Sequence, residues 1–425
     1  MVHSLQARVV VPIDRPAIER GFVTIDGERI VAVGKEGVDG HVVDLGCVAI
    51  LPGLVNAHTH LEFSHLPRPL GQTGMPLADW IRLVIGERGR GGDAPDDAIS
   101  AGLRESFTFG VTTIGDISAG DMAAYSSHFG ATDNPVGQTI DGQDSPSHDA
   151  ADVTAFVEAI GFSQARAESA FAAVGGRLAE LERIGSVRPG LSPHAPYTVS
   201  PDLLRRLVQL ARERELPVAM HLAESADELK LLRDGTGRLQ ELLVERSMWD
   251  ADAIPGGSRP LDYLRSLAAA PRSLVIHGNY LDTEEQAFLA AHADRMSLVY
   301  CPRTHDYFAH PPYPLAALLA AGVNVALGTD SRASNPDLDL LGEMRHAAAM
   351  HPEIEPHDIL RMGTLAGADA LGRADEVGSI TPGKLANLVA IPLPHGAGKS
   401  SENLLAALLA DHAVPCAVWL RGRKM

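Results

Sequence analysis

The fold of this chain is decided by the stretch Ala49-Ile50-Leu51-Pro52-Gly53-Leu54-Val55-Asn56-Ala57-His58-Thr59-His60, in which an apolar run leads into two histidines. In an extended chain, residues two apart point to the same side, so His58 and His60 face one space. Two imidazoles in that arrangement supply the first two ligands that a small cation needs. The stretch therefore predicts a buried strand with half of a metal site at its end.

Three further apolar runs each end in a residue that can bind a metal or move a proton. They are residues 216–220 before His221 (with Glu224 three residues later), residues 273–276 before His277, and residues 323–329 before Asp330. Such near-continuous runs are typical of strands that are covered on both faces, as in a parallel sheet. Because the carboxyl ends of barrel strands meet at one mouth, we expect these side chains to gather there.

Strand-like and helix-like segments alternate through the middle of the chain. Residues 111–116 and 297–301 are strand candidates, and Ser200-Pro201 is a typical start for a helix over 202–208. No glycine-rich nucleotide-binding turn follows a strand, which favours a barrel over a doubly wound sheet. We predict an α/β fold, a (β/α)8 TIM barrel, over residues 53–376.

Both ends of the chain contain short strand candidates. They are residues 7–11, 21–25 and 29–33 at one end, and 378–380, 386–391 and 417–420 at the other. We predict a small β-sandwich built from residues 1–52 and 377–425. Two stretches interrupt the central rhythm, about 119–150 and about 235–272. The first is expected to be an extended surface loop and the second a lid over the mouth, and ordinary surface insertions remain an equal alternative for both.

Composition limits the classes of function. The 425 residues are 45% hydrophobic and 21% charged, and the net charge of −18 argues against binding nucleic acid or an anionic membrane. No apolar run approaches the roughly 20 residues that span a bilayer, and no secretory signal is recognisable at the N-terminus. Three scattered cysteines predict no disulfide framework, which indicates the cytoplasm. A small-molecule substrate is the expected partner.

The chain resembles the amidohydrolase superfamily. The matching strings are residues 52–60 (PGLVNAHTH), 193–199 (PHAPYTV), 221–224 (HLAE) and 328–330 (GTD), in the expected order over nearly the whole chain. The resemblance is strongest to the metal-dependent cyclic-amine deaminases, a branch that includes atrazine and triazine hydrolases and nucleobase and nucleoside deaminases. Residues 60–64 (HLEFS) are locally similar to aminodeoxyfutalosine deaminases.

The resemblance implies a metal site and its catalytic groups. His58, His60, His221 and Asp330 would bind a divalent metal, which acidifies bound water toward neutrality. Glu224 would shuttle a proton to a ring nitrogen, His277 would steer the attacking hydroxide, and Asp330 would also accept a proton. A single histidine at a strand end is usually structural, and a glutamate that opens a helix is usually a cap. The complete set favours catalysis.

Substrate contacts are implied less directly. His194 resembles the histidine that faces the substrate in the family, and Arg303 follows Cys301-Pro302, where many relatives carry a Ser-Asn pair. That departure means that specificity cannot be copied from those relatives. Glu62 and Trp80 border the predicted pocket, although core packing or a surface role explains them equally well.

Lysine usage indicates the number of metals. Binuclear members of the family bridge two metals with a carboxylated lysine on the fourth strand, and no lysine occurs between Lys35 and Lys230. No strand-end glutamate is evident between His60 and His221 to replace it. We therefore predict one metal per chain. Zinc fits the nitrogen and oxygen ligands best, and iron(II) and manganese also fit.

The predicted reaction is hydrolytic deamination of an aminated heterocycle with release of ammonia. An adenine-type nucleoside such as aminodeoxyfutalosine, methylthioadenosine or adenosylhomocysteine is the leading substrate class, and guanine and cytosine remain open. Ring opening or dechlorination of another carbon–nitrogen substrate is the alternative reaction, and a non-catalytic scaffold is the alternative class. Scaffolds of that kind lose metal ligands, whereas this chain retains them. The sequence does not fix the oligomeric state, and a homo-oligomer would match the family.

Overall fold

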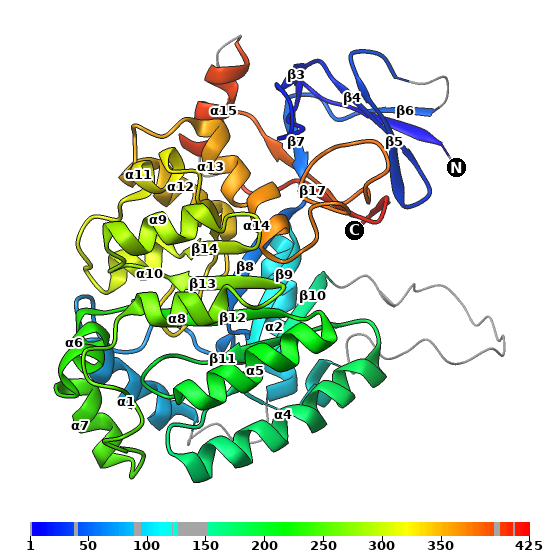
Figure 1. Ribbon diagram of the computed structural model, residues 1–425. Coiled ribbons are helices and arrows are strands. Elements are labelled where there is room, and N and C mark those ends of the chain that lie inside the picture. Colours follow the sequence, from blue (N-terminus) through cyan, green and yellow to red (C-terminus); the bar gives the residue numbers. More distant parts are fainter. Residues whose placement is uncertain are drawn as a thin grey trace.

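An eight-stranded parallel sheet forms the centre of the computed structural model, which describes residues 2–37, 41–88, 95–120, 122–125, 151–394, 400–410 and 413–425 (Figure 1). Its strands, in sheet and chain order, are β8 (Leu54–Thr59), β9 (Val111–Ser118), β10 (Asp152–Ala159), β11 (Arg188–Pro193), β12 (Pro217–Leu222), β13 (Arg272–His277), β14 (Met296–Tyr300) and β15 (Asn324–Leu327). A parallel bridge from Thr59 to Asp330 joins the first strand to the end of the last. The predicted (β/α)8 barrel is confirmed.

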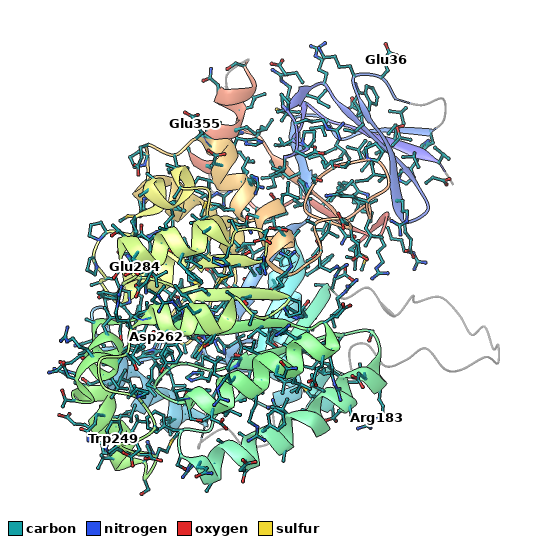
Figure 2. The ribbon with its side chains drawn as sticks, in the orientation of Figure 1. Glu36, Arg183, Trp249, Asp262, Glu284 and Glu355 are labelled. Carbon is teal, nitrogen blue, oxygen red and sulfur yellow. The ribbon has the colours of Figure 1, made fainter. Side chains whose placement is uncertain are left out.

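Helices cover the outside of this barrel. They are α1 (Leu77–Arg88), α2 (Pro95–Thr108), α4 (Gln164–Ile184), α5 (Pro201–Arg214), α6 (Ala226–Asp234), α7 (Arg238–Glu245), α8 (Pro260–Leu267), α9 (Thr283–Ala291), α10 (Pro302–Tyr307), α11 (Leu315–Ala320), α12 (Leu340–Met350), α13 (Pro356–Met362) and α14 (Leu365–Ala370), with short 3-10 turns η1 (Leu61–Phe63) and η2 (Met122–Tyr125). Helix α5 begins as predicted, because the Ser200 hydroxyl accepts from the Leu203 N–H at 3.2 Å. Acidic side chains such as Asp262 and Glu284 project from these helices into solvent (Figure 2).

The two ends of the chain form a β-sandwich beside the barrel (Figure 1). One sheet has the order β5-β4-β1-β6 and the other β18-β17-β16-β7-β2-β3. The strands are β1 (His3–Gln6), β2 (Val9–Val10), β3 (Ile18–Glu19), β4 (Phe22–Asp26), β5 (Arg29–Gly34), β6 (His41–Asp44), β7 (Val48–Pro52), β16 (Leu388–Pro392), β17 (Ala417–Leu420) and β18 (Arg423–Lys424). Ile25, Ile50, Leu388 and Trp419 share the core between the sheets, so the predicted sandwich is confirmed. Helix α15 (Ser401–Ala410) lies between β16 and β17 in the chain.

Some local predictions were wrong or fall outside the described residues. Residues 378–380 form no strand, because Gly378 adopts a φ of +83°, which ends extended structure. Most of the predicted loop at 119–150 lies outside the described residues. The stretch at 235–272 contains α7 and α8. Among the helices that the structure describes, none combines the length and apolar character needed to cross a bilayer.

Candidate active site

Side chains from three strands meet at the mouth of the barrel. His58 lies in β8 and His60 directly follows it. His221 lies in β12, and Asp330 follows β15. Nε2 of His60 lies 3.3 Å from Nε2 of His221, and Oδ1 of Asp330 lies 3.5 Å from Nε2 of His58 and 3.8 Å from Nε2 of His60. His58, His277 and Asp330 form a second group whose ligand atoms lie within 4.8 Å of one another. The structure thus brings the four predicted ligands together.

The chemistry of this cluster fits a divalent cation. His58 is fully buried, and neither of its ring nitrogens has a hydrogen-bond partner within the described chain. Burial lowers the pKa of His58 to about 3 and holds the pKa of His60 and His221 well below their ordinary value. Nδ1 of His221 donates to the carbonyl oxygen of His194 at 3.0 Å, so its Nε2 presents a lone pair. Neutral imidazoles with free lone pairs are the form that binds metals.

The backbone at the strand ends is strained where it presents these groups. Ala223, His277 and Asp330 adopt φ angles of +52°, +68° and +55°, in the left-handed region that residues with a Cβ rarely occupy. Gly328 precedes Asp330 by two residues, and a Cβ there would lie 2.8 Å from the carbonyl oxygen of His58. The strands therefore approach closely, and tertiary packing maintains conformations that cost free energy locally.

Asp330 is oriented by two hydroxyl groups. Oγ of Ser334 donates to Oδ2 of Asp330 at 2.9 Å, and Oγ1 of Thr304 lies 3.0 Å from Oγ of Ser334. The carboxylate therefore turns its other oxygen, Oδ1, toward the histidines.

Glu224 lies beside the cluster, as predicted. Its Oε1 is 3.5 Å from Nε2 of His277, and its Oε2 accepts from the hydroxyl of Tyr197 at 3.5 Å. Burial, with Asp330 and Glu228 nearby, raises the pKa of Glu224 well above its ordinary value. A carboxyl group whose pKa is raised in this way is suited to take up a proton and pass it on.

The turn that carries Glu224 is held by a second buried glutamate. The carboxylate of Glu228 accepts hydrogen bonds from the backbone N–H of Ala223 at 2.7 Å and of Glu224 at 3.0 Å. The Asn279 amide donates to the Glu224 carbonyl oxygen at 3.0 Å. Because Glu228 is fully buried and opens α6, it fixes the strained turn between strand and helix.

The cluster opens into a cavity of about 370 Å³. Its floor is polar, and its walls are mostly apolar side chains from α1 and α7. The lining residues include His60, His221, Glu224, His277 and Asp330 at the floor, Glu158, His194 and Tyr197 at one side, and Phe63, Trp80, Ile81, Val84, Leu239, Leu242 and Leu243 around the rest. A polar floor beneath apolar walls suits a flat heterocycle that carries a few polar atoms.

The predicted substrate contacts separate into two groups. His194 and Trp80 line the cavity. Glu62 does not line it, but its carboxylate pairs with Arg88, which does, at 2.5 Å. Arg303, contrary to the prediction, does not line the cavity, and its guanidinium pairs instead with Glu343 at 2.6 Å and Asp337 at 2.8 Å. It borders a different surface groove.

Two features of the site were missed from the sequence. Glu158 stands at the end of β10 and lines the cavity, so the expectation that no strand-end glutamate lies between His60 and His221 was wrong. The signal was present, since the mainly apolar run at residues 153–157 (VTAFV) leads into Glu158 as the other runs lead into their polar residues. The cavity-lining leucines of α7 carried no such signal, because leucines at helical spacing occur in any core.

An eight-stranded parallel barrel with histidines and acids gathered at its mouth is the architecture of a barrel hydrolase. The chain belongs to the amidohydrolase family, whose model matches residues 49–414. This confirms the predicted class, a hydrolase of carbon–nitrogen bonds.

Named relatives are similar over most of their length. A 5-methylthioadenosine/S-adenosylhomocysteine deaminase of Nitratidesulfovibrio vulgaris (strain DSM 19637 / Miyazaki F) is 30% identical over 409 residues, which cover 92% of this chain and 83% of the relative. The structure of an adenosine deaminase from Xanthomonas campestris with bound zinc has 26% identity and a TM-score of 0.75, covering 99% of this chain and 92% of that one. Helicobacter pylori aminofutalosine deaminase with methylthio-coformycin shares the fold, with a TM-score of 0.81 at 22% identity over the whole of both chains.

Proposed function

We propose that this protein is a metal-dependent deaminase of adenine nucleosides. One divalent metal per chain, zinc before iron(II) or manganese, is held by three histidines and an aspartate, namely His58, His60, His221 and Asp330. The observation that carries the proposal is that these side chains and the Glu224 carboxylate share the floor of one cavity. The relatives support the substrate class, because those named above deaminate adenine nucleosides according to their names.

The residues of the chain account for the proton transfers. A divalent metal would supply Lewis acidity and an acidified water as the nucleophile. Glu224 takes a proton from the attacking water and delivers it to the ring nitrogen beside the reacting carbon. His277, 3.5 Å from Glu224, stabilises the attacking oxygen by a hydrogen bond. Asp330 accepts the second proton of the water and passes it to the exocyclic amino group, and the bond from carbon to that nitrogen then breaks, so that the nitrogen leaves as ammonia and the carbon keeps the oxygen as a carbonyl.

The cavity favours a substrate of nucleoside size. Its volume of about 370 Å³ falls in the range of small-molecule sites. Apolar walls provide stacking and dispersion contacts for a purine, and the polar floor receives its amino edge. The net charge of −18 disfavours polyanionic ligands, and a nucleoside without phosphate groups is compatible with it.

An ammonia-release screen on metal-analysed protein tests the proposal. We expect turnover of adenosine, 5′-methylthioadenosine or S-adenosylhomocysteine, and none with guanine or cytosine. Glu224→Gln should retain the metal and lose at least about 100-fold of the activity, the size typical of a lost general acid–base group. The proposal fails if metal-loaded protein releases no ammonia from any adenine nucleoside, and the role of Glu224 fails if Glu224→Gln keeps full activity.

A further inference from the structure

A buried glutamate lines the cavity with no close partner for its carboxylate. Glu158 is the penultimate residue of β10, and its side chain is 4% exposed. Within the described part of the chain, its carboxylate accepts no hydrogen bond, and its one ion-pair contact is between Oε1 and Nε2 of His194, at 3.9 Å. This distance exceeds that of a hydrogen bond. A buried carboxylate that opens onto a ligand cavity in this way requires donors from the ligand.

The Thr198 hydroxyl oxygen lies between two partners, the carbonyl oxygen of Ala195 at 3.2 Å and Nδ1 of His194 at 2.6 Å. A hydroxyl group has one hydrogen, and when it donates to Ala195, Nδ1 of His194 is the donor in the other contact. We take His194 in that tautomer, in which Nε2 is an acceptor and lies 3.9 Å from Oε1 of Glu158. Two acceptors thus lie side by side on the cavity wall.

The charge of Glu158 is already balanced by neighbouring groups. Arg88, which pairs with Glu62, and Arg177 both act electrostatically on the Glu158 carboxylate. Arg177 also donates to the carbonyl oxygen of Glu158 at 2.8 Å and so fixes the end of β10. Burial raises the pKa of Glu158, and the two guanidinium groups oppose that shift. The charges of the two arginines, Arg88 and Arg177, balance those of the two acids, Glu62 and Glu158. Neutral hydrogen-bond donors of a ligand therefore suit this wall better than an ammonium group.

The two acceptors lie next to the metal ligands on the cavity wall. The imidazole of His194 is 5.1 Å from that of His221, measured between ring centroids, and its Nε2 is 3.9 Å from Oε1 of Glu158. A purine whose amino edge reaches the floor would extend its opposite end in this direction. That end carries the sugar, and ribose offers two neighbouring hydroxyl groups.

We propose that Glu158 and His194 bind the vicinal hydroxyl groups of a ribonucleoside, with Glu158 as the specificity-determining acceptor. The inference rests on the proposed function and narrows its substrates to ribonucleosides, in preference to free bases and deoxyribonucleosides. Each hydroxyl group that is removed from the substrate leaves an acceptor unsatisfied in a buried wall.

Substrate analogues test the inference in the intact, metal-loaded protein. We expect kcat/KM for adenosine to exceed that for 2′-deoxyadenosine or 3′-deoxyadenosine by about 10- to 100-fold, the size of one hydrogen bond to a charged acceptor. In Glu158→Gln the difference should shrink to less than about fivefold, mainly through loss of activity on adenosine. Glu180→Gln is the matched control, because Glu180 also acts on Arg177 but does not line the cavity.

A binding measurement separates this inference from the proposed function. Calorimetric titration with inosine and 2′-deoxyinosine requires no turnover and should show the same preference, lost in Glu158→Gln. Equal kcat/KM for adenosine and its deoxy analogues overturns the inference, as does a preference that survives in Glu158→Gln. A preference for 5′-amino-5′-deoxyadenosine over adenosine that depends on Glu158 would instead establish an ammonium site. Absence of all deamination would remove the proposed function, and inosine binding would still decide the role of Glu158.

Discussion

The imidazoles at the barrel mouth lower the stability of the folded protein unless a ligand satisfies them. Both ring nitrogens of His58 and Nδ1 of His60 are buried without partners in the described structure. Each unsatisfied buried polar group costs about 1–3 kcal/mol. A cation bound by these nitrogens would offset that cost, and its binding would then be coupled to folding.

Removal of one ligand should therefore affect metal content and stability together. We expect His221→Ala to lose bound metal and turnover, and a chelator to lower the melting temperature of the wild type but not of His221→Ala. The measurements are elemental analysis and thermal unfolding with and without chelator. His292→Ala, at the end of α9, should behave as wild type. Full metal retention in His221→Ala would refute the ligand assignment.

Glu228 acts on catalysis through the backbone of its neighbours. In Glu228→Gln, one of the N–H groups of Ala223 and Glu224 faces an amide NH2 instead of an oxygen. We expect kcat to fall about 10- to 100-fold while metal content is unchanged, because the strained turn loses a charge-assisted hydrogen bond. Ser200→Ala, which removes the cap of α5, should cost about 1 kcal/mol of stability and leave kcat unchanged. An unaltered kcat in Glu228→Gln would contradict the positioning role.

At the scale of elements, α1 and α7 lie side by side (Figure 1). Their side chains line one side of the cavity. Two ion pairs link the helices, Arg82 with Glu245 at 2.8 Å and Arg238 with Asp79 at 2.9 Å. These side chains are substantially exposed, and exposed pairs contribute at most about 1 kcal/mol. The buried leucines on the inner face of α7 contribute more, so apolar contact rather than charge maintains this wall.

A pair of adjacent substitutions in α7 tests this. Leu243 is buried and lines the cavity, whereas Val244 is 51% exposed on the outer face. We expect Leu243→Ala to raise KM about tenfold for nucleosides that contact the wall, with kcat within twofold, because each lost methylene contact is worth about 1 kcal/mol. Val244→Ala should change neither. Steady-state kinetics on both variants decide, and equal effects would refute the wall assignment.

The strand ends were predictable from the sequence, whereas side-chain directions after them were not. Apolar runs before His58, His221, His277 and Asp330 specify buried strands, and parallel strands bring their ends together whatever the loops do. Arg303 also follows a strand, but α10 begins at Pro302 and turns the arginine toward α12. Position after a strand therefore predicts proximity to the mouth but does not predict which way a long side chain points.

Over the whole molecule, the mouth of the barrel carries the candidate active site, and the opposite end has a structural role. The mouth holds strained backbone and unsatisfied imidazoles, and the opposite end joins the barrel to the sandwich. Asp152 begins β10 at that opposite end, and its carboxylate pairs with Arg421 of the terminal segment at 2.7 Å and with Arg373 at 3.2 Å. The predicted sandwich therefore has a structural contact with the barrel far from the chemistry, and changes there should affect stability alone.

Asp152→Ala tests this division between the two ends. Arg373 is 3% exposed, so removal of Asp152 leaves a buried guanidinium with only the half-exposed Glu376 as its acid partner. Loss of one partner from a buried pair costs roughly 3 kcal/mol, which urea unfolding would measure. Metal content and kcat/KM should stay within twofold of wild type, since Glu158, at the other end of the same strand, keeps its contacts.

Asp294→Ala, at an exposed pair with Arg295, should leave the unfolding midpoint unchanged. A parallel loss of metal in Asp152→Ala would show that the two ends are coupled through β10.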